Sequence, residues 1–370
     1  MTFRLLGAAA LCGALVLTGT IAAPAADAPA PQARATLSPA AFDAIGERAL
    51  ASNTAPGFVL AVVRGGRAVY ARGFGVANVA RSVPVTPRTR FAIGSLSKQF
   101  TATAVLRLRD AGKLGLDDRL ATYVPSLPNA NAITLRMLLN QNSGLHNFPL
   151  TTEHAWPLQG AIDPQRIIDI LATDKPDFEP GTKWAYSNAN YAALAYVAAR
   201  TSGMPYGRYL ARTIFTPLGM TSSADGYAAQ QAGTATPYEG TGTFTVPEPP
   251  LSLDLFYGAG GIVSTADDMV RWDAALMRGT LLGAASMHDL WTAGTLANGK
   301  PVRYAMGFVP STLDGHREVW HNGLTPYAGG YCYNAIFPDD DLAVIVLSNG
   351  AGFRNQPEAM VREVLAAYFR

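Results

Sequence analysis

The chain has 370 residues, of which 49% are hydrophobic and 15% are charged, and its formal net charge is +2. This composition is typical of a globular protein and excludes a disordered or fibrous chain. The Lys, Arg, Asp and Glu residues are scattered and form no basic patch, so the charge pattern indicates no nucleic-acid partner.

The first 25 residues have the pattern of a secretory signal peptide. Arg4 precedes the apolar run 5–17, and small residues at 23–25 form a cleavage site. The run is too short to prefer a membrane span, and lipid attachment is not expected at Cys12 inside it. We therefore expect export to the periplasm or the medium, cleavage near Ala25 and no remaining membrane anchor.

Cysteine and histidine usage argues against a disulfide or a metal centre. Removal of the signal peptide leaves Cys332 as the only cysteine, so no intramolecular disulfide can form. The histidines lack HExxH or other metal-ligand spacing; they are His146, His154, His288, His316 and His321. We expect no metal and no other cofactor.

The N-terminal part predicts a leader, a helix and a hairpin. Residues 26–37 are rich in Ala and Pro and predict a flexible leader. Ser38-Pro39 begins an expected helix that continues to about Ser52, with Pro at the first helical position. The β-rich stretch 58–71 contains Gly65-Gly66 and predicts a β-hairpin around this turn.

Helical patterns dominate residues 91–299. The expected helices cover 95–110, 134–139, 164–173, 190–202 and 266–277. Residues 222–258 are rich in Gly, Thr and Pro, with aromatic residues interleaved, and we interpret them as a long loop. Such a loop either forms a rim of the functional site or is an ordinary surface loop.

After residue 300 the pattern changes to short β-rich runs. These runs are 304–309, 317–322, 331–337 and 342–348, and a final helix is expected over 356–369. Strands at both ends with helices between them predict an α/β (α+β) fold. One sheet domain would comprise 38–90 plus 300–370, and 91–299 would form an inserted, mostly helical domain.

Ser95 and Lys98 form a Ser-x-x-Lys pattern where the helix 95–110 begins. Residues three apart share a helix face, so the hydroxyl and the amine can meet. A helix N-terminus also offers free N–H groups and partial positive charge to an oxyanion. These are the parts of an acyl-transfer site. Taken alone, the pattern also fits a capping serine followed by a solvated lysine.

Three downstream segments add candidate residues. The turn-rich segment 178–188 (FEPGTKWAYSN) contains Tyr186 and Asn188, and His321-Asn322-Gly323 stands near the end of an expected strand. The third segment, 258–266 (GAGGIVSTA), does not satisfy G-x-G-x-x-G, so we attribute its glycines to packing. Taken singly, Tyr186 is better explained as a core tyrosine and Asn188 as a helix cap, and His321 also fits a surface histidine at the end of a strand.

In this order, Ser-x-x-Lys, Tyr-x-Asn and His-x-Gly resemble the motifs of the serine β-lactamase and penicillin-recognising D,D-peptidase superfamily. The class C-like branch is most similar; it includes D-alanyl-D-alanine carboxypeptidases, D-aminopeptidases and family VIII esterases. Further similar segments are 133–145 (ITLRMLLNQNSGL), 217–221 (PLGMT) and 346–349 (VLSN). The resemblance implies a β-lactamase/transpeptidase-like fold, with an antiparallel sheet flanked by helices and the active site in the cleft beside the helical domain.

The resemblance also implies roles in a two-step acyl transfer. Ser95 would attack a carbonyl and become acylated, and Lys98 or Tyr186 would take its proton; which of the two is the base stays open. Asn188 would hold the Lys98 side chain and a substrate amide. The N–H groups of Ser95 and Leu324 would bind the oxyanion. The other expected substrate-binding residues are His321, Gly323 and Thr325.

Two departures from the family pattern narrow the expected substrate. Many β-lactamases carry Lys-Thr-Gly where this chain has His321-Asn322-Gly323, and a mostly neutral histidine attracts a carboxylate less than lysine does. Gln141 stands where the family often has His, with structural consequences only.

We therefore expect a small-molecule or peptide substrate with a D-amino-acid peptide or ester carbonyl, peptidoglycan stem peptides included. The alternatives are β-lactam hydrolysis and a non-catalytic member that binds peptidoglycan or a protein. The sequence indicates no oligomeric state.

Overall fold

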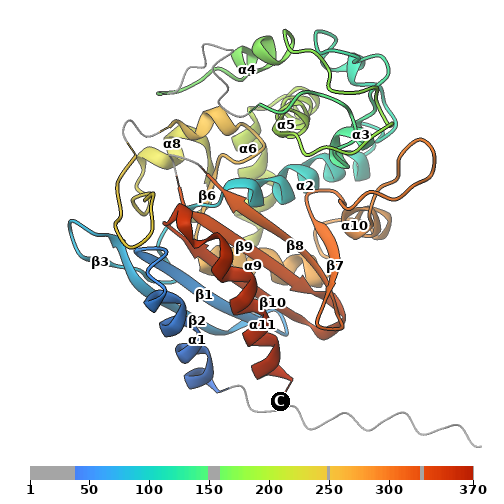
Figure 1. Cartoon of the computed structure of the whole chain (residues 1–370). Coiled ribbons are helices and arrows are strands. Elements are labelled where there is room, and N and C mark those ends of the chain that lie inside the picture. Colours follow the sequence, from blue (N-terminus) through green and yellow to red (C-terminus); the bar gives the residue numbers. More distant parts are fainter. Residues whose placement is uncertain (1–37, 149–158, 248–250, 326–328, 370) are drawn as a thin grey trace, which may run out of the picture. The chain divides into compact units, whose positions relative to one another are not determined.

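The computed structural model describes residues 38–148, 159–247, 251–325 and 329–369. These residues belong to one compact unit, Leu37–Arg370 (Figure 1). The expected signal peptide, 1–25, and leader, 26–37, lie outside the described residues.

One seven-stranded sheet joins the two ends of the described chain. Its strands lie in the order β3-β2-β1-β10-β9-β8-β7, and each paired neighbour is antiparallel. The strands are β1 (Gly57–Arg64), β2 (Arg67–Asn78), β3 (Val83–Pro84), β7 (Val309–Leu313), β8 (His316–Leu324), β9 (Tyr331–Phe337) and β10 (Leu342–Ser348). The predicted α+β class and the predicted sheet from both chain ends are confirmed.

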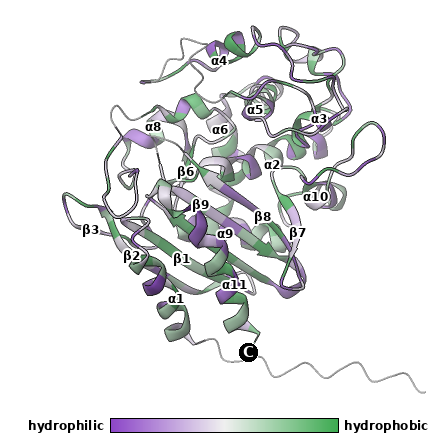
Figure 2. Ribbon diagram, viewed as in Figure 1, coloured by the Kyte–Doolittle hydropathy of each residue, from purple (hydrophilic) through white to green (hydrophobic). Residues whose placement is uncertain are grey.

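The central strands are apolar on both faces because both faces are covered. Along β1, Phe58, Leu60 and Val62 belong to one core cluster, and the alternate residues Val59 and Ala61 belong to the other. This is the two-residue period of a strand. Figure 2 shows the hydrophobic colour of β1 within the sheet. The predicted hairpin is confirmed, and both residues of its Gly65-Gly66 turn have positive φ, as a type I′ turn requires.

Helices cover the two faces of this sheet. Helices α1 and α11 contact each other and the strands on one face, and α9 packs against β1, β2 and β10 on the other (Figure 1). The helices are α1 (Pro39–Ala51), α2 (Ser97–Asp110), α3 (Leu135–Leu139), α4 (Pro164–Leu171), α5 (Asn188–Ser202), α6 (Tyr206–Leu210), α7 (Thr216–Leu218), α8 (Gly226–Gln231), α9 (Ala266–Met277), α10 (Ala284–Trp291) and α11 (Gln356–Tyr368). Within the described ranges no helix is long and apolar enough to cross a membrane.

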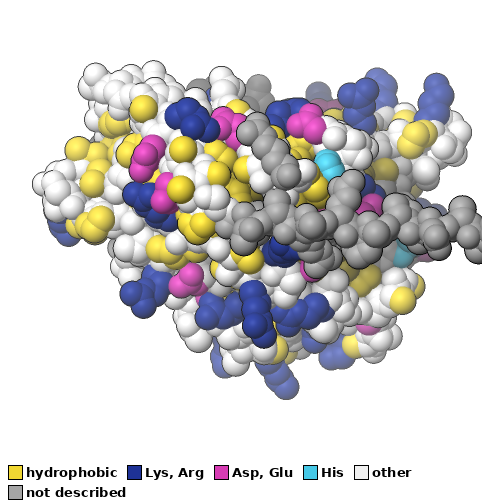
Figure 3. All heavy atoms as spheres, turned by 90° about the horizontal axis from the view of Figure 1, so that it is seen from below, with side chains coloured by type: hydrophobic (Ala, Val, Ile, Leu, Met, Phe, Trp, Pro, Cys, Tyr) yellow, Lys and Arg dark blue, Asp and Glu magenta, His cyan; other side chains and the backbone are white. Residues whose placement is uncertain are grey.

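A second, small sheet leads the chain into α2. Its strands lie in the order β4 (Phe91–Ala92), β6 (Ile262–Ser264), β5 (Ala224–Asp225). Ile93 continues the pairing, since its N–H donates to the carbonyl of Ile262 at 3.0 Å. The start of α2 is therefore tied to the Gly-rich segment that precedes β6. On the face shown in Figure 3, basic and acidic side chains are interspersed with hydrophobic ones.

Two predicted elements were wrong. The run 304–309 is not a strand, because β7 begins only at Val309. Gly307 has a φ of +81°, and a Cβ there would lie 2.7 Å from the carbonyl oxygen of Lys98, so this stretch is an irregular segment packed on α2. The stretch 222–258, expected as a loop, contains β5, α8 and a 3-10 turn at Leu253–Phe256 in its described part. The Asp254 side chain accepts the N–H of Tyr227 and stabilises this local structure.

A buried polar cluster joins α2, α9 and β9. Gln99 Oε1 accepts a hydrogen bond from Trp272 Nε1 at 3.0 Å, and Asn334 Nδ2 donates to Asp273 Oδ1 at 2.8 Å. The second oxygen of Asp273 and the Asn334 side-chain oxygen have no partner among the described residues. Burial raises the pKa of Asp273 to about 8, against the lowering effect of the Asn334 hydrogen bond.

Asp273→Asn is expected to stabilise the protein at neutral and alkaline pH. In the unfolded chain the Asp273 carboxyl loses its proton at about pH 4. In the folded protein the same carboxyl stays protonated up to about pH 8. Between these values the folded state binds more protons, so raising the pH lowers the free energy of unfolding by at most about 1.4 kcal/mol per pH unit. Urea unfolding of both proteins at several pH values in this window measures the difference. An unchanged pH dependence in the variant would contradict the assignment.

Candidate active site

Ser95 lies on a short 3-10 turn, Gly94–Leu96, that runs directly into α2. Gly94 has a φ of +56°, in the left-handed region that favours glycine, and so lets the chain turn after β4. Ser95 is half-buried, and Lys98, one helical turn later, is fully buried. The structure brings the pair together as predicted, with Lys98 Nζ 3.0 Å from Ser95 Oγ.

The Lys98 amine is surrounded by neutral oxygen atoms. Its Nζ lies 2.8 Å from Asn188 Oδ1 and 2.7 Å from the carbonyl oxygen of Ala259. Burial lowers the pKa of Lys98 well below its ordinary value, because a buried ammonium loses its hydration. A neutral amine has two hydrogens and one lone pair. When the amine is neutral, the oxygens of Asn188 and Ala259 can accept its two hydrogens and its lone pair can accept from the Ser95 hydroxyl; when it is protonated, its third hydrogen donates to Ser95 Oγ.

Tyr186 reaches the same hydroxyl from the segment before α5. Its OH donates to Ser95 Oγ at 2.8 Å. Burial raises the pKa of the Tyr186 phenol above its ordinary value, so the phenol stays protonated. Gln141 holds this segment: its carbonyl accepts the N–H of Ala185 at 3.1 Å, and its side-chain oxygen accepts the N–H of Ser187 at 3.0 Å.

Asn188 is the first residue of α5 and not its cap. The cap is Ser187, whose hydroxyl accepts the N–H of Ala189. The backbone N–H of Asn188 donates to Asn147 Oδ1 at 2.9 Å, which fixes the start of the helix. The Asn188 side chain is therefore free to hold Lys98, as the family resemblance implies, and it remains partly exposed.

The end of β8 passes close to the nucleophile turn because both segments have glycine there. A Cβ on Gly323 would lie 2.0 Å from the carbonyl oxygen of Ile93 and 3.2 Å from the nitrogen of Ser95. A Cβ on Gly94 would lie 2.9 Å from the nitrogen of Leu324. Any side chain at either glycine would force the two backbone segments apart.

This approach places two N–H groups near each other. Thr325 donates its N–H toward β9, to the carbonyl of Gly330 at 3.4 Å. Successive N–H groups of a strand point to opposite edges, so the N–H of Leu324 points away from β9. The N–H groups of Leu324 and Ser95 thus lie on adjoining backbone segments, an arrangement suited to an oxyanion.

The side chains of the other two predicted binding residues are buried. His321 is 3% exposed, and its Nε2 lies 3.0 Å from the hydroxyl of Tyr304. Thr325 is fully buried; its hydroxyl stands 2.8 Å from the position of a Cβ on Gly94 and has no partner among the described residues. The Thr325 side chain thus lies against the nucleophile turn, and the His321 ring lies against Tyr186 and Tyr304.

Sequence reasoning missed two contacts of the site. The glycines of 258–261 were attributed to packing, and a Cβ on Gly258 would indeed lie 2.6 Å from the carbonyl oxygen of Tyr191. The same turn also directs the carbonyl of Ala259 to Lys98, and no side-chain motif marks a backbone oxygen. Tyr304 was missed because its stretch had the composition of an ordinary strand.

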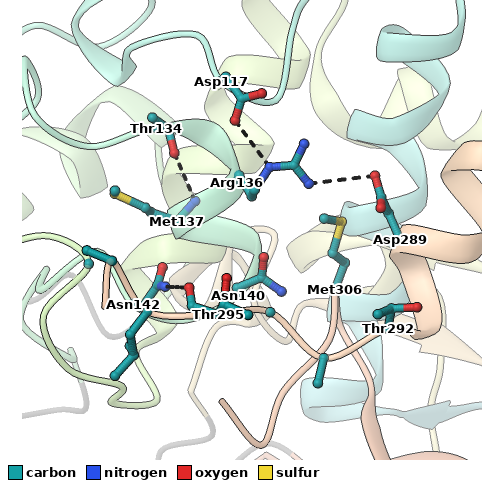
Figure 4. A pocket seen from close by; sticks show the side chains of 15 residues that line it. Asp117, Thr134, Arg136, Met137, Asn140, Asn142, Asp289, Thr292, Thr295 and Met306 are labelled. Carbon is teal, nitrogen blue, oxygen red and sulfur yellow. Dashed lines mark hydrogen bonds and ion pairs between the residues drawn. The ribbon is translucent and has the colours of Figure 1, made fainter. Parts of the chain in front are cut away.

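A pocket of about 330 Å³ lies beside α3 and α10 (Figure 4). In this pocket the Arg136 guanidinium forms ion pairs with Asp117 at 3.2 Å and Asp289 at 3.6 Å, so the charge of Arg136 is already paired. None of Ser95, Lys98 and Tyr186 lines this pocket. No group of three or more His, Cys, Asp or Glu residues within the described ranges is placed to hold a metal ion. The candidate active site is therefore the cluster around Ser95.

Comparisons with known proteins agree on one family. The family model described as Beta-lactamase matches residues 42–368. The putative penicillin-binding protein PbpX of Bacillus subtilis (strain 168) is 33% identical over 302 residues, which are 78% of this chain and 69% of that protein.

Two further matches carry D-amino-acid names. The D-aminopeptidase of Brucella abortus (strain S19) is 29% identical over 314 residues, 84% of this chain but 59% of the longer relative. The crystal structure of D-amino acid amidase from Ochrobactrum anthropi SV3, complexed with L-phenylalanine amide, matches with a TM-score of 0.74 at 23% identity. That match covers 89% of this chain and 97% of the amidase.

Proposed function

The chain belongs to the Beta-lactamase family and is a serine hydrolase of the D,D-peptidase type, and from this premise we propose that it forms an acyl-enzyme on Ser95. The observation that carries the proposal is the convergence on one oxygen: Ser95 Oγ lies 3.0 Å from Lys98 Nζ and 2.8 Å from Tyr186 OH. A non-catalytic binding protein has no need of this arrangement.

In the first step, Ser95 Oγ attacks the substrate carbonyl and its proton passes to the lone pair of Lys98. The two neutral oxygens that hold the Lys98 hydrogens direct this lone pair, so Lys98 is the base that we favour. The oxyanion is held by the N–H groups of Ser95 and Leu324, each such donor contributing about 3 kcal/mol.

Tyr186 then acts as the proton donor to the leaving group. Tyr186 OH is protonated and bonded to the same oxygen, so it is placed to give a proton to the departing amine or alcohol. The proton gained by Lys98 balances the one that Tyr186 gives up. Water next attacks the acyl-enzyme, and reversal of the proton transfers releases the acid and restores Ser95.

The substrate that we propose is a D-amino-acid peptide or amide, or a small ester. The position that carries a lysine in many β-lactamases is held here by His321, which is buried and engaged. It therefore presents no cation to the carboxylate of a β-lactam, and this disfavours β-lactams relative to peptidase or esterase substrates. The names of the D-aminopeptidase and D-amino acid amidase relatives support the same choice. We also propose that the protein is exported and loses residues 1–25.

One purified sample tests these proposals against each other. p-Nitrophenyl acetate, D- and L-alanine amide, D-Ala-D-Ala and nitrocefin are compared as substrates, and a fluorophosphonate is used as a covalent label. We expect an ester or a D-amino compound to be turned over faster than nitrocefin, and the reverse order would favour a β-lactamase.

Two further results would reject parts of the proposal. A folded protein that no reagent acylates and that cleaves no ester would favour the binding member of the family. N-terminal sequencing of exported protein checks the processing site, and retention of residues 1–20 would refute export by a cleaved signal.

A further inference from the structure

Tyr304 is a buried residue that contacts two parts of the candidate site, Tyr186 and His321. It is 1% exposed and belongs to the irregular segment before β7. Its hydroxyl lies 3.0 Å from His321 Nε2. Its ring meets the ring of Tyr186 edge-on, with centroids 6.2 Å apart, and that of His321 edge-on at 5.7 Å. One aromatic side chain thus contacts both a proposed proton carrier and the strand that supplies the oxyanion N–H.

The hydrogen bonds of His321 assign its tautomer. Nδ1 lies 2.5 Å from the carbonyl oxygen of Asn322, and a carbonyl can only accept, so Nδ1 carries a hydrogen. In the neutral ring Nε2 then has a lone pair and accepts from the Tyr304 hydroxyl. Burial is the largest cause that lowers the pKa of His321, to about 3, so the ring is neutral at physiological pH.

Both ring nitrogens of His321 are therefore used inside the protein. Nδ1 is held by the backbone of its own strand, and Nε2 is held by Tyr304. The groups facing the ring are Lys98 from α2, Tyr186 from the segment before α5, and Tyr304. No nitrogen is left to donate to a substrate, so the contribution of His321 must come through what it holds in place.

The segment that carries Tyr304 is itself fixed to the nucleophile helix. Gly307 lies so close to α2 that a Cβ there would be 2.7 Å from the carbonyl oxygen of Lys98. The carbonyl of Tyr304 accepts the N–H of Gly294 at 3.1 Å and the side-chain amide of Asn140 at 3.5 Å. Tyr304 is thus anchored independently of β8 and can act as a reference point for the end of that strand.

We propose that Tyr304 is a positioning residue: through its hydroxyl it holds His321 in the Nδ1–H tautomer, and so sets the distance between the Leu324 N–H at the end of β8 and Ser95. The edge-on contact between the Tyr304 and Tyr186 rings also restrains the position of the Tyr186 phenol. This inference rests on the proposed function, because it assigns His321 a supporting role in the same acyl transfer. Tyr304 and His321 then act together as one hydrogen-bonded pair, and neither side chain contacts the substrate directly.

Tyr304→Phe tests the hydroxyl while keeping the ring. We expect kcat for the best ester to fall about tenfold with KM nearly unchanged, since the hydrogen bond to His321 that orients the transition-state donors is lost. The hydroxyl also interacts with Tyr191 and Gln141, so the kinetic change counts for the inference only together with a change at His321. The matched control is Tyr209→Phe, which removes another buried hydroxyl, one bonded to the Ala104 carbonyl at 3.4 Å on the far part of α2. The control is expected to keep wild-type kinetics.

A second readout follows the tautomer directly. Nitrogen-15 NMR of the histidine rings, with the His321 signals assigned from a His321→Gln spectrum, should show the Nδ1–H form in the wild type from about pH 8 to about pH 5, in keeping with a depressed pKa. In Tyr304→Phe the same ring should titrate at higher pH, because Nε2 has lost the donor that stabilised its lone pair.

The outcomes separate the inference from the function it rests on. A fall in kcat together with a changed His321 tautomer or titration supports the inference. Unchanged NMR signals, or changed signals with unchanged kcat, would overturn it even if the wild type is an active serine hydrolase. A wild type that turns over no substrate would instead reject the proposed function, and the NMR comparison would still report whether Tyr304 holds His321.

Discussion

Ser95→Ala is expected to lower kcat/KM for esters or D-amino compounds by roughly 10⁴-fold or more, the scale seen when a nucleophile is removed from a catalytic unit. Lys98 and Tyr186 converge on the oxygen of this hydroxyl, so its loss removes both the nucleophile and the one atom that the two proton carriers share. Steady-state kinetics with the best substrate of the panel measures the effect. Fluorophosphonate labelling of the variant should disappear as well.

Substitution of a serine outside the candidate site provides the control for Ser95→Ala. Ser126 is exposed and lies outside the candidate site, so Ser126→Ala should keep wild-type activity and labelling. The Ser95→Ala protein should unfold at a temperature close to that of the wild type, because the half-buried hydroxyl is replaced by a smaller side chain without a new buried charge. Labelling of folded Ser95→Ala at the wild-type rate would show that another residue is the nucleophile.

Lys98→Gln is expected to lower kcat/KM by about 10²- to 10⁴-fold, the usual contribution of a general base. A glutamine amide can still donate toward Asn188 and Ala259, but it has no basic lone pair for the Ser95 proton. Thermal unfolding should show that the variant is folded. The exposed Lys113 provides the control, Lys113→Gln, which should be fully active.

The pH dependence of wild-type activity also tests the role of the Lys98 amine. Burial lowers the pKa of Lys98, so the neutral amine persists well below the ordinary pKa of lysine. Activity should therefore fall on the acid side as Lys98 takes up a proton, and should be retained as pH rises through neutrality. A folded Lys98→Gln protein as active as Lys113→Gln would exclude Lys98 as the base.

Local patterns in the sequence predicted the frame of this site well. The spacing of Ser95 and Lys98 requires only that the chain be helical there, and the structure places the two groups in contact. The hairpin at Gly65-Gly66 and the β-rich runs followed from local composition and turn residues, which do not depend on distant contacts. The approach of Tyr186 to Ser95 came from the family resemblance, because no local rule joins residues 91 positions apart.

The parts that escaped prediction depend on tertiary packing. The stretch 304–309 has strand composition, yet its close approach to the Lys98 carbonyl at Gly307 prevents regular pairing. The Ala259 carbonyl acts through the backbone and leaves no residue signature. The burial of His321 and Thr325 could not be read from their types, since both are common at surfaces.

Covalent trapping of the unmodified protein followed by peptide mapping tests the core of this account. After reaction with a fluorophosphonate and protease digestion, mass spectrometry should find one phosphonyl group per chain, carried by the peptide that includes residue 95. An adduct on any other side chain, or none on a folded and substrate-competent protein, would mean that the convergence of amine, phenol and alcohol seen here is not the reacting centre.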